Sequence, residues 1–113
     1  MNTPYSKQAK EYIEKIKHLN VFDLVLGNEE ILKTLRENYS KKHYAGIVYD
    51  TGTRLEIYEW VMVSGITFYS EQEEIPYYLQ DADVHLWRNN QYLTSVKLKN
   101  IICLENKKEK YEN

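Results

Sequence analysis

The sequence predicts a single α+β domain in which two N-terminal helices precede a strongly bent antiparallel sheet or small β-barrel of about five strands. Two observations support this fold class. Apolar residues recur at helical spacing over the first 41 residues, whereas strand-type alternation and turn signals fill most of the remainder. Helices and strands that are segregated along a chain are typical of α+β folds, and short strands joined by tight turns favour a barrel or a bent sheet.

The first helix is expected over residues 4–18. Thr3 and Pro4 supply an N-cap followed by proline at the first helical position. The apolar residues that follow are spaced by three and four, which places them on one helical face: Tyr5, Ala9, Tyr12, Ile13, Ile16 and Leu19.

The second helix is expected over residues 28–41. Asn28 is a good N-cap residue, and Glu29 and Glu30 follow in the first turn, where the helix dipole favours negative charge. The apolar run before it, residues 21–26, is too short for its periodicity to distinguish a helical turn from a short strand.

From Tyr44 onwards the pattern is that of strands. Gly65 interrupts one strand pattern and indicates a bulge or sharp bend. Asn89 and Asn90 can adopt the two positive φ angles of a two-residue hairpin turn. We expect a turn at 50–53 and strands over 45–49, 54–69, 84–87, 91–98 and 101–105. The domain should therefore span residues 1–105, followed by a charged tail, 106–113, that frays.

A shared core should enclose the apolar positions of both helices and of the alternating strands. Cys103 has apolar neighbours in the sequence, so it is expected to be buried and unreactive as well. The other predicted core residues are Ile13, Ile16, Leu32, Leu35, Ile47, Leu55, Ile57, Leu86, Leu93 and Val96.

The cysteine content and the N-terminus indicate the compartment. A single cysteine excludes an internal disulfide. The N-terminal residues lack the apolar segment of a signal peptide, and the longest apolar stretches fall far short of the ~20 residues that span a bilayer. We therefore expect a cytoplasmic protein that has no membrane partner.

No motif in the sequence indicates catalysis or a cofactor. The histidines at 18, 43 and 85 have no partner at the spacing of a zinc site. The four glycines are isolated, so neither a phosphate-binding loop nor a dinucleotide fingerprint is present. Glutamates 71, 73 and 74 fit a solvated loop better than an acid–base set, because no apolar pocket is indicated nearby. We expect a non-enzymatic protein with no metal and no cofactor.

The last hairpin carries the main candidate for a binding surface. If Asn89 and Asn90 form the turn, Trp87 pairs with Tyr92 and Leu86 with Leu93. The aliphatic pair should face the core, which leaves both aromatic rings on the other face. Such a pair can simply stabilise a sheet, but rings beside cations also stack bases while the cations neutralise phosphates. The pattern predicts a small regulatory protein that binds single-stranded RNA through Trp87, Tyr92, Arg88, Lys97 and Lys99.

The distribution of charge and tyrosine supports an alternative. Residues 44–83 carry one basic residue against eight acidic ones, although the whole chain has a net charge of only −2. The chain also has eleven tyrosines, whose amphipathic side chains suit interfaces. An acidic, tyrosine-rich surface would suit a protein-interaction module, such as an inhibitor of a host or defence enzyme encoded by a phage or plasmid. An ordinary solvated rim would carry the same charges.

Overall fold

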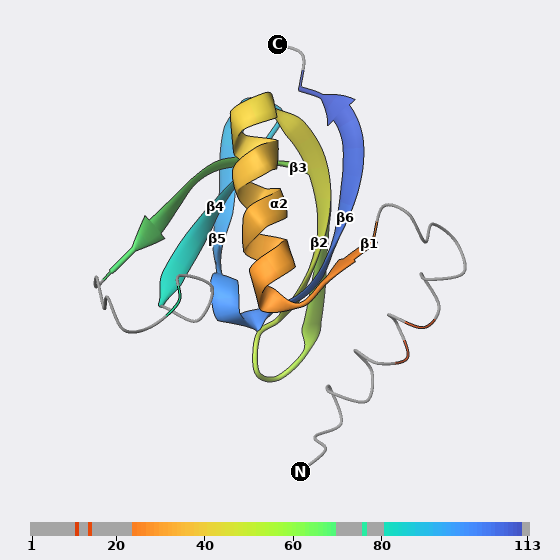
Figure 1. The fold of residues 1–113 in the computed structure, drawn as a ribbon, viewed down its shortest axis with the longest axis vertical. Coiled ribbons are helices and arrows are strands. Elements are labelled where there is room, and N and C mark those ends of the chain that lie inside the picture. Colours follow the sequence, from red (N-terminus) through yellow and green to blue (C-terminus); the bar gives the residue numbers. More distant parts are fainter. Residues whose placement is uncertain (1–10, 12–13, 15–23, 70–75, 77–80, 112–113) are drawn as a thin grey trace.

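The computed structural model describes residues 11, 14, 24–69, 76 and 81–111. They form one long helix packed against one face of a six-stranded antiparallel sheet, with strand order β1-β6-β2-β3-β4-β5 (Figure 1). The elements are β1 (Leu24–Leu26), α2 (Asn28–Lys41), β2 (His43–Asp50), β3 (Leu55–Phe68), β4 (Ala82–Arg88), β5 (Gln91–Lys97), the 3-10 helix η3 (Leu98–Asn100) and β6 (Ile101–Lys110).

The α+β class and the antiparallel sheet are confirmed, whereas the alternative of a closed barrel was wrong and the sheet has six strands instead of about five. The sheet is open because β1 and β5 form its two edges. The sixth strand is β1, which comes from the apolar run that the sequence left unassigned. The last strand, β6, continues beyond residue 105 and pairs with β2 as far as Lys110, opposite His43. The helix predicted over 4–18 lies outside the described residues, apart from Glu11 and Glu14.

Helix α2 has the predicted bounds. Its N-cap is Gly27 instead of Asn28, and Gly27 has a φ of 88°, a conformation that glycine adopts without steric cost. The two glutamates of the first turn and Lys41 of the last turn complement the helix dipole. The side of the helix that faces the sheet buries Ile31, Leu32, Leu35 and Asn38.

Register shifts bend the sheet at three places that matter for the site. The shift at Gly65 confirms the bulge that the sequence predicted between β3 and β4. Between β2 and β3, two residues of β3, Glu59 and Trp60, oppose Gly46 alone. Between β4 and β5, Leu93 is the extra residue. A β-bulge of this kind increases the local twist and redirects the side chains that follow it.

The core lies between α2 and one face of the sheet. Leu32, Leu35, Ile47, Leu86 and Val96 are buried, as predicted. Leu55 is partly buried, and the two predicted core residues of the first helix, Ile13 and Ile16, lie outside the described residues.

Two of the predicted core positions were wrong. Ile57 is 45% exposed, because Tyr58, which lies opposite Ile47, is the residue that packs on the core. Leu93 is 37% exposed, because the bulge places Thr94, not Leu93, opposite Leu86. The predicted pairing of Leu86 with Leu93 was therefore off by one residue.

Cys103 is fully buried, as predicted. It lies opposite Val48, outside the core that α2 covers. Burial raises the pKa of its thiol to about 12, so the reactive thiolate is scarce at neutral pH.

Candidate nucleic-acid interface

Four side chains form a continuous row across the strands β2, β3, β4 and β5. Tyr44 lies opposite Met62, Met62 lies opposite Trp87, and Trp87 lies opposite Tyr92. Directly opposed residues of neighbouring strands project to the same face of a sheet. We call these four residues, three aromatic residues and one methionine, the aromatic row. Adjacent strands lie ~4.8 Å apart, so the row spans roughly 14 Å.

The aromatic row lies on the face of the sheet that points away from α2. Successive residues of a strand point to opposite faces, and Tyr44, Met62 and Trp87 each have a sequence neighbour buried in the core. Tyr92 is 59% exposed, and the other three members of the row are partly buried. The row is therefore most accessible at its β5 end. The buried neighbours are Ala45, Val61, Val63 and Leu86.

Two further rings extend the row at its β2 end. The ring centroids of Trp60 and Tyr44 are 5.7 Å apart, and those of Tyr111 and Tyr44 are also 5.7 Å apart. Both pairs meet edge to face, which is a favourable arrangement for aromatic rings. Trp60 is nevertheless 42% exposed. Its φ of 56° is rare for a bulky residue and arises in the bulge of β3.

Lys107 reaches this group of rings from β6. Its Nζ atom lies 4.8 Å from the centroid of the Trp60 ring and 3.2 Å from an oxygen of Glu105. A Cβ atom at Gly46 would lie 3.5 Å from Cε of Lys107. The lysine side chain therefore crosses β2 above Gly46 and places a cation over the exposed indole, a favourable cation–π arrangement.

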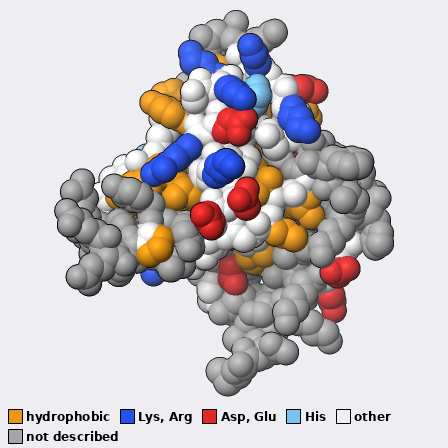
Figure 2. All heavy atoms as spheres, in the orientation of Figure 1, with side chains coloured by type: hydrophobic (Ala, Val, Ile, Leu, Met, Phe, Trp, Pro, Cys, Tyr) orange, Lys and Arg blue, Asp and Glu red, His pale blue; other side chains and the backbone are white. Residues whose placement is uncertain are grey.

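Other basic residues gather at the same end of the sheet. Lys42 follows the last turn of α2, and the amide of Tyr111 donates a 2.6 Å hydrogen bond to its carbonyl oxygen. Arg88 follows Trp87 and donates to the carbonyl oxygen of Glu59 at 2.7 Å. Figure 2, which looks onto the side of the sheet covered by α2, shows Lys and Arg side chains grouped where α2 ends. The C-terminal ends of α2, β4 and β6 lie at this end of the sheet, which we call the basic end and define by Lys42, Arg88, Lys108 and Lys110.

The structure groups three of the five predicted binding residues and separates the other two from them. Trp87 and Tyr92 are paired, and Arg88 adjoins them. Lys97 lies five residues further along β5 than Tyr92, roughly 17 Å away. Lys99 lies beyond it in η3.

The ammonium group of Lys97 is engaged in ion pairs. It lies 3.4 Å from Asp81 and 3.2 Å from Asp83, and also over the ring of Tyr69 at 5.2 Å. A hydrogen bond from the Tyr69 hydroxyl lowers the pKa of Asp83, and the hydrogen bond to Lys97 acts in the same direction. This lysine is therefore poorly placed to bind a phosphate.

A line of polar groups runs beside the aromatic row, on the side away from the basic end. His85 bonds through Nε2 to the Thr67 hydroxyl and through Nδ1 to the Ser95 hydroxyl, both at 2.7 Å. The Ser95 hydroxyl also lies 2.9 Å from the hydroxyl of Tyr92. We call Thr67, His85, Ser95 and Tyr92 the polar line. Tyr92 belongs to the line through its hydroxyl and to the row through its ring.

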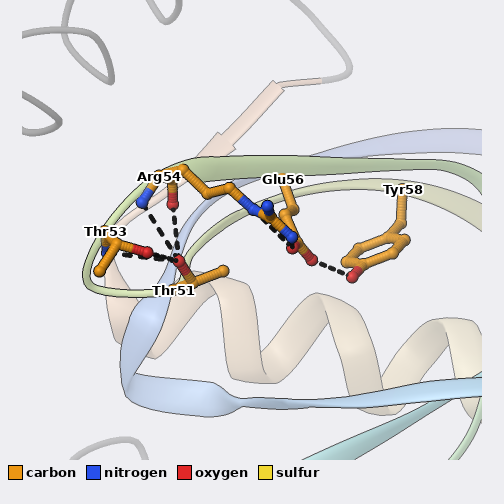
Figure 3. Close-up of polar contacts among 5 residues, drawn as sticks. All are labelled: Thr51, Thr53, Arg54, Glu56 and Tyr58. Atoms are coloured by element: carbon orange, nitrogen blue, oxygen red, sulfur yellow. Dashed lines mark hydrogen bonds and ion pairs between the residues drawn. The ribbon is translucent and has the colours of Figure 1, made fainter.

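Carboxylates of the acidic middle segment are engaged within the protein. Figure 3 shows Arg54 and Tyr58 both directed toward Glu56. Arg54 lies 2.7 Å from one oxygen of Glu56, and Tyr58 donates a short hydrogen bond to the other. This bond raises the pKa of Tyr58 to about 12 and lowers the pKa of Glu56. Residues 71, 73 and 74 of the same segment lie outside the described residues.

Sequence reasoning missed Tyr44, Trp60, Met62, Lys107 and Tyr111. One signal was present: in the run from Trp60 to Val63, the valines alternate with larger side chains, which indicates that Trp60 and Met62 point away from the core. Nothing in the sequence indicates that Tyr44 and Tyr111 lie beside them, because these contacts join different strands.

The described part of the chain contains no group of three or more His, Cys, Asp or Glu side chains that could hold a metal ion. Within the same residues, no helix is both long and apolar enough to cross a membrane. No known protein family, curated protein sequence or solved structure matches the chain.

Proposed function

We propose that this chain binds single-stranded RNA on the face of its sheet that points away from α2. The observation that carries this proposal is the register that aligns Tyr44, Met62, Trp87 and Tyr92 across four adjacent strands. Aromatic rings on the surface of a sheet can stack successive bases, and such stacking requires no particular sequence.

The charges around the row support the same ligand. Lys107 places a cation beside the rings, because its Nζ atom lies 4.8 Å from the centroid of the Trp60 ring. Phosphate binding by such cations releases counterions, so affinity should fall as salt is added. Since Lys97 is held by Asp81 and Asp83, it contributes less to this effect than the sequence suggested.

A protein partner that binds an acidic, tyrosine-rich surface is the second candidate. Exposed tyrosines favour it, among them Tyr39 and Tyr69. The carboxylates of Glu56 and Asp83 weaken it, because each is already bonded to a cation and a tyrosine of the same chain. RNA binding is therefore the better supported proposal.

Fluorescence polarisation with labelled single-stranded RNA, in low and moderate salt, tests the proposal. Loss of one stacking ring costs about 1–3 kcal/mol, so each of Trp87→Ala and Tyr92→Ala should lower affinity at least about fivefold. Tyr39→Ala is the matched control, because Tyr39 is 54% exposed but lies on α2. Circular dichroism should show the same fold in all variants.

The results separate the two candidates. Equal losses for Tyr92→Ala and Tyr39→Ala would refute a role for the aromatic row. If the wild-type protein does not bind RNA even at low salt, where phosphate contacts are strongest, the RNA proposal fails and a protein partner becomes the better hypothesis.

A further inference from the structure

We infer that residues 4–18, the segment predicted as the first helix, cover a second row of side chains on the face of the sheet that points away from α2. We call it the apolar row. It lies apart from Trp87 and Tyr92, which belong to β4 and β5, so this inference does not depend on the proposed function. Directly opposed residues of β1, β6, β2 and β3 form the apolar row: Leu26, Cys103, Val48 and Ile57.

The apolar row lies on the outer face because the sequence neighbours of its members lie in the core. Ile47 and Leu104 are buried in the core under α2, and they adjoin Val48 and Cys103 in the sequence. Successive residues of a strand project to opposite faces. Residues 45–48 of β2 are nevertheless all buried. A sheet with one solvated face alternates buried and exposed residues, so consecutive buried residues indicate that β2 is covered on both faces.

The burial along the apolar row indicates the size of the element that covers it. Cys103 and Val48, in the middle, are 0% and 4% exposed, whereas Leu26 and Ile57, at the ends, are 39% and 45% exposed. Among the described residues, both helices, α2 and η3, contribute to the core on the other face, so neither explains this burial. A helix is about 10 Å wide and neighbouring strands are ~4.8 Å apart. One helix along β6 and β2 would therefore bury the middle of the row and leave its ends partly exposed.

The segment 4–18 has the pattern, the length and the position that this contact requires. Its apolar residues share one helical face, and charged residues occupy the opposite face. Two residues of the charged face, Glu11 and Glu14, are described, and both are helical and exposed. A helix of this length spans ~22 Å. Only residues 19–23 separate the segment from β1, which contributes Leu26 to the row, and this connection spans at most ~17 Å. The segment can therefore reach the apolar row from the edge of the sheet.

Methyl NMR on the wild-type chain tests the contact directly. In protein labelled at the isoleucine and valine methyl groups, nuclear Overhauser effects should join Val48 to Ile13, to Ile16 or to both. A mixture of chains labelled only at valine with chains labelled only at isoleucine reveals contacts between copies alone. If no such effect joins Val48 to residues 4–18, the inference is wrong. If the effects arise only between copies, the inference is also wrong, and the apolar row belongs to a dimer interface.

The accessibility of Cys103 provides a second measurement. In the double variant Ile13→Ala and Ile16→Ala, the folded protein should react with the thiol reagent DTNB at least about tenfold faster than wild-type protein. Each shortened side chain weakens a buried contact by about that factor, and labelling of a buried thiol follows local opening. The matched control, Glu11→Ala and Glu14→Ala, changes two exposed residues of the same segment and should stay within about twofold of the wild-type rate.

Circular dichroism should show that both double variants are folded. Equal labelling rates in the two variants would overturn the inference, because the apolar face of the segment would then not cover Cys103. If the isoleucine variant unfolds, the nuclear Overhauser effects of the wild-type chain decide.

Discussion

Replacing Asn38 by leucine should stabilise the protein, and the size of the effect follows from its surroundings. The Asn38 side chain is fully buried on the inner side of α2, one turn beyond Leu35. Among the described residues, neither its amide nitrogen nor its amide oxygen finds a hydrogen-bond partner. Burying such a group costs about 1–3 kcal/mol. Leucine has the same branching with methyl groups in place of the two polar atoms, and it favours helix by a few tenths of a kcal/mol.

The free energy of unfolding should therefore rise by about 1–3 kcal/mol in Asn38→Leu, measured by urea denaturation with circular dichroism. Ser40→Leu is the control, because this exposed position on the same turn reports the helix propensity alone. Asn38→Ala removes the amide without adding volume and guards against overpacking. If both Asn38 variants lose more than about 1 kcal/mol, the amide is well hydrogen-bonded in solution and the reasoning is wrong.

Two further substitutions test the register and the bulge. Leu86→Ala should lower the free energy of unfolding by about 2–5 kcal/mol, because Leu86 is fully buried. Leu93→Ala should lower it by less than about 1 kcal/mol, because Leu93 is exposed. Equal losses in urea denaturation would contradict the observed pairing. Trp60→Gly should change stability by less than about 1 kcal/mol, because relief of the left-handed backbone offsets the lost ring contacts, while fluorescence polarisation should show weaker RNA binding. A loss above about 2 kcal/mol would show that the Trp60 ring is structural.

Features that local residues determine could be predicted from the sequence. The spacing of Leu32 and Leu35 indicates α2, and Asn89 and Asn90 form the predicted turn with φ angles of 55° and 65°. This turn fixes the pairing of Trp87 with Tyr92. Just beyond that pair, the bulge at Leu93 shifts the strand by one residue. Alternation cannot locate such a shift, because the apolar pattern looks the same on either side of it.

The rest of the candidate site depends on contacts between strands that are distant in the sequence. Tyr44, Trp60 and Tyr111 belong to the start of β2, the middle of β3 and the residue after β6. Their proximity follows from the pairing of β2 with both β3 and β6, which no local pattern encodes. Lys107 reaches Trp60 by passing over Gly46, where an added Cβ atom would lie 3.5 Å from its Cε.

The backbone of Trp60 argues that this group of rings serves binding rather than stability. A left-handed conformation costs a residue other than glycine roughly 1–2 kcal/mol, and burial recovers only part of this cost because 42% of the residue stays exposed. Glycine would adopt the same backbone without that cost. A strained residue that keeps an exposed indole beside Tyr44 and under Lys107 is better explained by a ligand that covers the ring. The same ligand would reach Trp87 and Tyr92, because the register joins them to Tyr44 in one row.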